Sequence, residues 1–188
     1  YMDVSLYHDS LDLFCENLNN GSSRILEIGC GPGNISRYLL SKLPELDLLG
    51  IDIAENMIGL AARNNPEGEF KVMDCREISQ LNEKFDGVVC GFCLPYLSKK
   101  DAVKLISDIS VLLRPGGVVY LSTMEADHNR SGYKGSDSAE EKLYIYYHEA
   151  DDLIEVLRKT GMRILKSFYL ENPVNEKDVR DLVILAGK

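Results

Sequence analysis

A chain of 188 residues, 45% of them hydrophobic, is long enough to bury the core of one domain. With 21 Lys and Arg against 30 Asp and Glu, its formal net charge is −9, and no long basic run occurs. Nucleic acid or an anionic membrane is therefore not expected as the main partner, because binding phosphate groups requires clustered Lys and Arg. No apolar run approaches the ~20 residues that span a bilayer and no signal peptide is visible, so we expect a cytoplasmic protein.

The first segment of the chain is predicted to be an N-terminal helical cap or lid, residues 1–22. Apolar residues recur at helical spacing over 6–18, and the polar residues 19–22 end that helix. Because the sequence starts with Tyr1 and not with Met, we expect that this segment can be truncated.

A strand, a glycine-rich turn and a helix follow in direct succession. The apolar residues 24–28 are typical of a strand covered on both faces. Three glycines at alternate positions over 29–33 allow a sharp turn and leave the backbone open to a ligand. The helix expected over 34–43 directs its free N–H groups to the same space. A cofactor pocket is therefore predicted near residues 27–34.

Strands and helices then alternate along the chain. Strands are expected at 47–52, 69–73, 85–91 and 118–123, with helices at 55–64 and 99–113. This rhythm predicts an α/β fold with an open, mostly parallel sheet and helices on both faces. Ligands of such sheets bind outside the carboxyl ends of the strands.

The last third of the chain has a different pattern. Residues 125–141 are polar and contain glycine, so we expect a long loop there. A helix at 149–160 precedes strands at 162–170 and 180–186. Two successive strands with no helix between them indicate an antiparallel pair at the sheet edge.

Three carboxylates lie at the predicted ends of the first three strands. Asp52 follows Gly29 by 23 positions, where an acidic residue can accept hydrogen bonds from a ribose diol. Asp74 closes the next strand, from which a carboxylate can reach the exocyclic amine of an adenine. Both residues are equally consistent with helix caps. Glu27 lies inside an apolar strand, where a carboxylate needs a cation or hydrogen-bond donors.

Together these motifs resemble the class I S-adenosylmethionine-dependent methyltransferases of the type 11/12-like kind. The likeness spans roughly residues 23–188. It rests on Glu27-Ile-Gly-Cys-Gly-Pro-Gly33, Gly50-Ile-Asp-Ile53 with Met57, Asp74, Phe85-Asp-Gly-Val-Val89, Leu113-Arg-Pro-Gly-Gly117 and Thr160-Gly-Met162. The resemblance implies one domain over 1–188 with a Rossmann-like, doubly wound, seven-stranded sheet of order 3-2-1-4-5-7-6, strand 7 being antiparallel.

The resemblance also implies the cofactor S-adenosyl-L-methionine, with S-adenosyl-L-homocysteine as product and no metal. The methionine part would lie against the glycine turn, with its amine near Glu27, and Asp52 would hold the ribose hydroxyls. The other positions implied to contact the cofactor are Gly29, Cys30, Gly31, Gly33, Ile53, Met57, Asp74, Cys75, Gly91 and Phe92.

The methyl acceptor is expected on the side of the sheet that follows strands four and five, with residues 125–148 as a substrate-side insertion. The candidates for this pocket are Tyr7, Cys93, Tyr96, Glu125, Tyr144, Tyr146 and Tyr147, and those for a catalytic group are Tyr96, His128 and His148. Surface exposure of the histidines and packing of the tyrosines against the sheet are the plainer interpretations. The Asn/Asp-Pro-Pro-Tyr/Phe run typical of many amide and exocyclic-amine methylases does not follow the fourth strand. That difference and the acidic charge favour a small-molecule acceptor, bound by a monomer or homodimer.

Three alternatives remain open at the level of the sequence. A dinucleotide-binding Rossmann protein prefers glycine or alanine where Asn34 stands. A methyltransferase-like subunit could bind the cofactor without turnover. Cys90-Gly-Phe-Cys93 has the spacing of a redox dithiol or half a zinc site, although two small residues at the end of a buried strand explain it as well.

Overall fold

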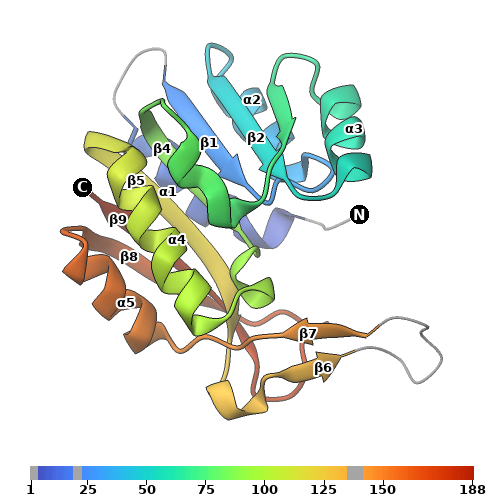
Figure 1. Ribbon diagram of the computed structural model, residues 1–188, viewed down its shortest axis with the longest axis vertical. Coiled ribbons are helices and arrows are strands. Elements are labelled where there is room, and N and C mark those ends of the chain that lie inside the picture. Colours follow the sequence, from blue (N-terminus) through green and yellow to red (C-terminus); the bar gives the residue numbers. More distant parts are fainter. Residues whose placement is uncertain (1–3, 19–22, 135–141) are drawn as a thin grey trace.

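The computed structural model describes residues 4–18, 23–134 and 142–188, and one large sheet dominates it (Figure 1). Its strands are β1 (Arg24–Ile28), β2 (Asp47–Asp52), β3 (Glu69–Val72), β4 (Phe85–Gly91), β5 (Leu113–Glu125), β8 (Arg163–Leu170) and β9 (Arg180–Gly187). The α-helices are α1 (His8–Glu16), α2 (Asn34–Lys42), α3 (Glu55–Asn64), α4 (Lys99–Leu112) and α5 (Ala150–Lys159). Short 3-10 helices are η1 (Ser5–Tyr7), η2 (Cys75–Gln80), η3 (Leu94–Tyr96) and η4 (His128–Arg130), and a second sheet pairs β6 (Gly132–Lys134) with β7 (Leu143–Ile145).

The strand order of the large sheet is β3-β2-β1-β4-β5-β9-β8. The pairs from β3 to β5 are parallel, and β9 is antiparallel to both of its neighbours. Since β8 and β9 are the sixth and seventh strands of this sheet along the chain, the predicted order 3-2-1-4-5-7-6 is confirmed. The parallel register places the carboxyl ends of β1, β2, β3 and β4 along one edge.

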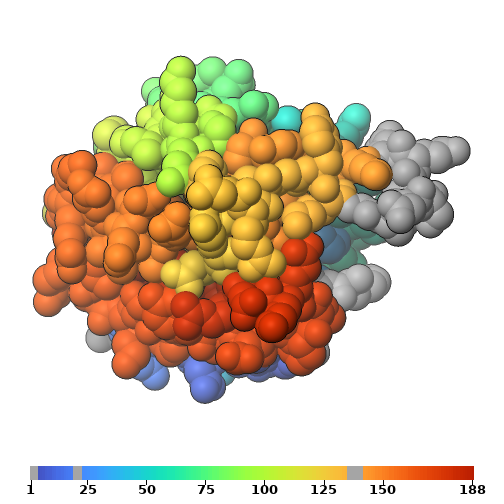
Figure 2. Space-filling model, turned by 90° about the horizontal axis from the view of Figure 1, so that it is seen from below, coloured from blue at the N-terminus to red at the C-terminus, as the bar shows by residue number. Residues whose placement is uncertain are grey.

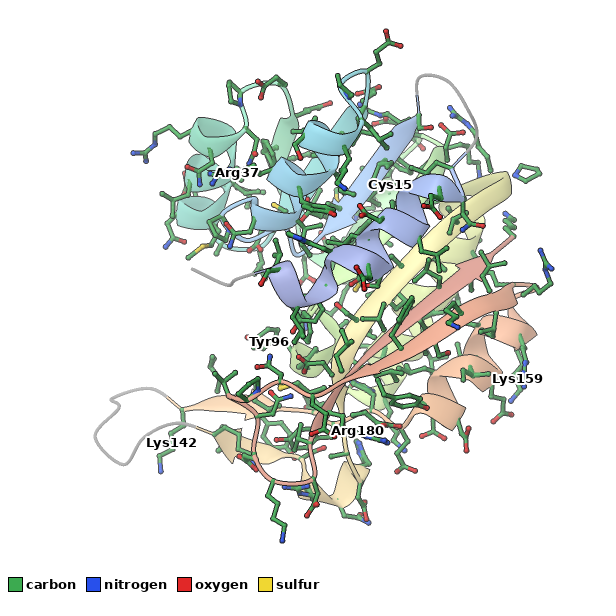
Figure 3. The ribbon with its side chains drawn as sticks, turned by 180° about the vertical axis from the view of Figure 1, so that it is seen from behind. Cys15, Arg37, Tyr96, Lys142, Lys159 and Arg180 are labelled. Atoms are coloured by element: carbon green, nitrogen blue, oxygen red, sulfur yellow. The ribbon has the colours of Figure 1, made fainter. Side chains whose placement is uncertain are left out.

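Both faces of the sheet are buried, because successive residues of its central strands enter different cores. Val88 and Cys90 of β4 belong to the core that includes Leu105 of α4, whereas Val89 belongs to the core that includes Phe14 of α1. Figure 1 shows α4 and α5 in front of the sheet, and Figure 3, seen from behind, shows α1 and α2 across the other face. The predicted doubly wound arrangement is therefore confirmed.

The prediction of one long loop after the fifth strand is wrong in part. β5 extends to Glu125, η4 follows, and β6 pairs antiparallel with β7, with Tyr133 opposite Tyr144. The two tyrosine rings meet edge to face at 5.1 Å between centroids. Three-residue strands are too short to give a recognisable alternation, which is why the sequence pattern did not reveal them. Figure 2 shows this segment, in yellow and orange, on the surface of the molecule. Residues 135–141 of the predicted loop lie outside the described residues.

Smaller differences concern element boundaries. β5 starts at Leu113 and not at 118, because Leu113 already pairs with Phe85 before the register shifts. The helix predicted over 6–18 begins as the 3-10 turn η1, and α1 ends at Glu16. Within the described ranges, no helix combines the length and apolar character that crossing a membrane requires.

One carboxylate is enclosed within this framework. Glu27 of β1 is only 1% exposed, and the hydroxyl of Ser36 in α2 donates a hydrogen bond to it. Burial raises the pKa of Glu27 to about 8; the Ser36 hydrogen bond opposes this shift, and the charge of Asp52 adds to it. Glu27 therefore links β1 to the helix that follows the glycine turn, at an energetic cost whenever it is ionised.

We expect the Glu27→Gln variant to be more stable than the wild type at pH 8 and similar to it at pH 4.5. The unfolded glutamate ionises near pH 4.5 and the folded one near pH 8, so the native state retains a proton that the unfolded state has lost. Wild-type stability should therefore fall across this window, by a few kcal/mol relative to the variant. Urea unfolding at both pH values measures this difference.

The matched control for that comparison is Glu67→Gln, since Glu67 is an exposed residue. It should leave the pH dependence of the wild type unchanged. Parallel stability curves for the wild type and Glu27→Gln would contradict the assignment of a neutral, buried Glu27.

Candidate functional site

The turn after β1 is built from glycines in a left-handed backbone conformation. Gly29, Gly31 and Gly33 have φ values of 68°, 52° and 81°, a region that residues with a Cβ seldom adopt. At Gly33 an added Cβ would also lie 2.2 Å from Nδ2 of Asn65 and 3.2 Å from Cα of Ala61. The glycines are therefore needed both for the turn and for its close packing on α3.

The carboxylate of Asp52 fixes this turn to the end of β2. Its Oδ2 accepts a hydrogen bond from the backbone N–H of Gly31 at 2.9 Å, and its Oδ1 accepts one from the backbone N–H of Ala54, also at 2.9 Å. Asp52 thus supports the start of α3, as the capping interpretation predicted, and faces the glycine turn at the same time.

The carboxylate of Asp74 has a local partner in Arg76. It accepts from the backbone N–H of Arg76 at 2.9 Å, capping η2, and from Nε of the same residue at 2.9 Å. The hydrogen bond from the Arg76 side chain holds the pKa of Asp74 below its usual value. The capping interpretation is therefore confirmed for Asp74, and its guanidinium partner stands at the same strand end.

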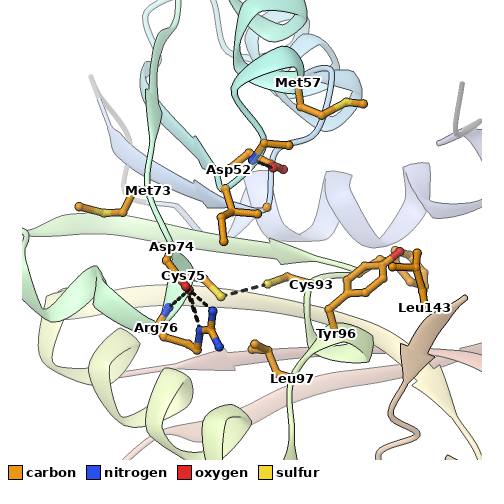
Figure 4. Close-up of a pocket in the computed structure, with 14 residues that line it drawn as sticks. Asp52, Met57, Met73, Asp74, Cys75, Arg76, Cys93, Tyr96, Leu97 and Leu143 are labelled. Carbon is orange, nitrogen blue, oxygen red and sulfur yellow. Dashed lines mark hydrogen bonds and ion pairs between the residues drawn. The ribbon is translucent and has the colours of Figure 1, made fainter. Parts of the chain in front are cut away.

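A cavity of about 600 Å³ opens where these strand ends meet (Figure 4). This volume is within the range of small-molecule sites. Its walls are formed by Gly29, Asp52, Ile53, Ala54, Met57, Met73, Asp74, Cys75, Arg76, Phe92, Cys93, Tyr96, Leu97 and Leu143. The cavity lies at the carboxyl ends of the parallel strands, as the sequence predicted for a ligand site.

Most of the residues predicted to contact a cofactor are brought together here. Seven of them line the cavity: Gly29, Asp52, Ile53, Met57, Asp74, Cys75 and Phe92. The other five, which are Glu27, Cys30, Gly31, Gly33 and Gly91, are not among its lining residues. Glu27 and Gly91 are directed toward α2: Ser36 donates to Glu27, and a Cβ at Gly91 would lie 2.4 Å from Cδ1 of Ile35.

Neither histidine predicted as a catalytic group reaches the cavity. His148 is 2% exposed, its Nε2 lies 2.9 Å from the carbonyl oxygen of Leu94, and burial lowers its pKa. It lines a separate hollow between α4 and α5. Nδ1 of His128 lies 2.9 Å from the carbonyl oxygen of Tyr147. Among the three catalytic candidates, Tyr96 lines the cavity.

The remaining acceptor-side candidates are divided in the same way. Cys93 and Tyr96 line the cavity, whereas Glu125 binds Arg180 at 2.8 Å on another part of the surface. Tyr147 is buried in a small core beside β7, which is the packing role that the plainer interpretation gave it.

Three further tyrosines lie close to the cavity without lining it. The Tyr7 ring meets the Phe92 ring edge to face at 5.2 Å, and its hydroxyl donates to Asp181 at 2.5 Å. Tyr144 packs against the rings of Tyr133 and Tyr146.

Sequence reasoning missed five residues of the cavity wall, namely Ala54, Met73, Arg76, Leu97 and Leu143. Ala54, Met73 and Arg76 adjoin predicted residues, so their position at strand ends was a usable signal. Leu143 comes from β7, which is held against η3 by a hydrogen bond from the backbone N–H of Tyr146 to the carbonyl of Pro95 at 2.8 Å. No local pattern indicates such a distant contact. In the described ranges, no group of three or more His, Cys, Asp or Glu side chains is arranged to hold a metal ion.

The chain was compared with protein families and curated proteins. A family model described as a methyltransferase domain matches residues 25–117. A putative methyltransferase of Invertebrate iridescent virus 6 is 34% identical over 118 residues, covering 61% of this chain and 43% of that protein. A trans-aconitate 2-methyltransferase of Variovorax paradoxus is 28% identical over 98 residues, covering 52% of this chain and 37% of that protein. The chain spans less than half the length of these two relatives.

Solved structures share the whole fold. Magnesium protoporphyrin IX methyltransferase from Synechocystis, solved with bound S-adenosylmethionine, superposes with a TM-score of 0.74. The match covers 97% of this chain and 80% of that one at 20% identity, so it bears on the fold alone. The family match over β1 to the start of β5, the strand order and the glycine turn agree with one another. The chain belongs to the class I S-adenosylmethionine-dependent methyltransferases.

Proposed function

We propose that this chain uses S-adenosylmethionine to methylate an O, N or C nucleophile of a small molecule. The observation that carries the proposal is the position of Asp52, whose carboxylate is fixed to the glycine turn at the wall of a cavity of about 600 Å³. The family match supports the reaction, and the trans-aconitate methyltransferase among the relatives supports a small acceptor.

The residues of the cavity fit the proposed cofactor. Each oxygen of Asp52 accepts one backbone hydrogen bond, which leaves acceptor capacity for two ribose hydroxyls. Ile53, which is 65% exposed, and Met57 offer apolar cover for an adenine ring. Gly29 has no side chain to separate the backbone from the methionine part. Glu27 lies beneath the turn, and we retain it as a distant electrostatic partner of the amine.

The opposite wall of the cavity is suited to hold an acceptor. When bound, the cofactor supplies a methyl group that its positively charged sulfur has already activated. Cys93, Tyr96, Leu97 and Leu143 line that wall, which is largely apolar, and can exclude water from the reacting atoms. Binding two reactants in line can contribute about 7–11 kcal/mol to the rate enhancement.

Proton removal is the one chemical task that the cavity wall assigns to few groups. The described lining residues include no histidine, and Asp52 and Asp74 are engaged with backbone and Arg76 donors. Tyr96 is the remaining candidate for contact with a proton of the acceptor. We therefore expect acceptors whose nucleophilic atom needs little help from a base, such as a carboxylate or a neutral amine.

Calorimetric titration with S-adenosylmethionine and S-adenosylhomocysteine, with NADH as control, is the first test of the proposal. Binding of the first two ligands and not of NADH is expected. Formation of S-adenosylhomocysteine in the presence of small carboxylic acids, amines or phenols then distinguishes an enzyme from a subunit that binds without turnover. Preferential binding of NADH would contradict the proposal.

The Asp52→Ala variant should bind S-adenosylhomocysteine about 10- to 150-fold more weakly than the wild type. A hydrogen bond to a charged group contributes about 1.5–3 kcal/mol, which corresponds to that range. Calorimetry measures the affinity, and Asp52→Asn serves as a second variant because it retains the size of the side chain. Asp151→Ala on α5 is the control, since Asp151 is exposed and distant from the cavity wall. Wild-type affinity in both Asp52 variants would refute the ribose assignment.

The Tyr96→Ala variant should separate acceptor binding from cofactor binding. Tyr96 lines the acceptor wall and is 58% exposed, so its removal should leave S-adenosylhomocysteine affinity within about twofold and reduce turnover about tenfold or more. The matched control is Tyr133→Ala, an exposed tyrosine outside the cavity. Equal turnover of Tyr96→Ala and wild type with the best acceptor would exclude Tyr96 from the acceptor site.

A further inference from the structure

Two cysteines that are far apart in sequence meet at the wall of the cavity. The Sγ atoms of Cys75 and Cys93 lie 3.6 Å apart, and both residues line the cavity (Figure 4). The sequence had suggested a different partner for Cys93, because Cys90 precedes it with C-x-x-C spacing. Cys90, however, is fully buried in the core beneath the sheet and does not line the cavity.

Each of the two thiols is held in place by its own surroundings. Cys75 opens η2, whose start is fixed by the Asp74 cap. Cys93 packs against Gly29, where an added Cβ would lie 3.1 Å from Cβ of Cys93, and its carbonyl accepts from the backbone N–H of Tyr96 at 3.1 Å. The two sulfur atoms therefore face one another across the gap between η2 and η3, an orientation that favours reaction between them.

We propose that Cys75 and Cys93 form a reversible disulfide site in which low-molecular-weight disulfides are the oxidant. One cysteine thiolate attacks the reagent disulfide and releases one reagent thiol, leaving a mixed disulfide on the protein. The second thiolate then displaces the other reagent thiol and closes the Cys75–Cys93 bond. The two protein thiols lose two electrons and two protons, and one reagent disulfide is reduced to two thiols.

The disulfide would change the cofactor wall, a consequence that rests on the proposed function. A disulfide bond is about 2.05 Å long, so closing it brings the two sulfur atoms roughly 1.5 Å nearer than they lie now. Because Cys93 is packed against Gly29, most of the movement falls on Cys75 and its neighbour Asp74. We therefore expect the oxidised chain to bind the cofactor more weakly, and the bound cofactor to oppose oxidation by the same factor.

The electrostatics of the site set the expected pH dependence of the reaction. The hydrogen bond with Cys93, followed by burial, raises the pKa of the Cys75 thiol. For Cys93 the hydrogen bond to Cys75 lowers the pKa, but contact with Cys90 and burial outweigh it and leave the pKa raised. Only the thiolate attacks a disulfide, so bridging should be slow at pH 7 and accelerate up to pH 9 and above.

The test incubates the full chain with 2-hydroxyethyl disulfide at pH 8.5, alkylates the remaining thiols and maps the bridged peptides by mass spectrometry. The expected result is a Cys75–Cys93 bridge that dithiothreitol reverses and that is absent from both Cys75→Ser and Cys93→Ser. Cys15→Ser, which changes a cysteine of α1 outside the cavity, should retain the bridge. A Cys90–Cys93 bridge, or mixed disulfides with no bridge, would overturn the proposal.

A second arm of the experiment tests the coupling to the cofactor. Saturating S-adenosylhomocysteine should slow bridging about tenfold or more, and the bridged chain should bind this ligand correspondingly more weakly. A chain that binds S-adenosylhomocysteine but bridges at an unchanged rate would refute the coupling. A chain that bridges without binding the ligand at all would refute the proposed function and leave the disulfide site standing, so the two failures are distinguishable.

Discussion

The hydrogen bonds of Asp52 are the interaction on which the rest of the site depends. One carboxylate accepts from Gly31 in the turn after β1 and from Ala54 at the start of α3, and so connects two neighbouring strand ends. The turn itself has three residues with positive φ and few other constraints on its conformation. By fixing it, Asp52 also sets the position of Gly29 on the cavity wall and, through Gly29, the place where Cys93 packs.

Burial on both faces of the sheet makes this local arrangement rigid. Neighbouring residues of β4 enter opposite cores, so a shift of one residue in its register would place apolar side chains in the wrong environment throughout. The strand ends at the cavity are consequently fixed by packing that takes place far from them. Glu27 is the exception within this apolar framework, and its hydrogen bond with Ser36 keeps the helix after the glycine turn in register with β1.

The two walls of the cavity have different origins. The wall at the ends of β1, β2 and β3 consists of residues adjacent to sequence motifs that are typical of the family. The opposite wall combines η3 with β7, which the hydrogen bond between Tyr146 and Pro95 joins, and it gives the cavity Tyr96 and Leu143. In this fold the first wall is shared among relatives and the second is free to vary, so specificity for an acceptor is expected to reside in the second.

The sequence by itself determined the strand order, the glycine turn and the cluster of carboxylates at the strand ends. These features follow from short-range patterns: apolar runs, glycine spacing and the position of an acidic residue directly after a strand. Tertiary structure alone decided that His148 points into a core, that β7 reaches the cavity, and that Cys93 faces Cys75 and not Cys90. Each of these depends on contacts between residues 18 to 54 positions apart, or on pairing between very short strands. Periodicity carries no information about such contacts, because packing against distant segments, and not local propensity, fixes where those side chains lie.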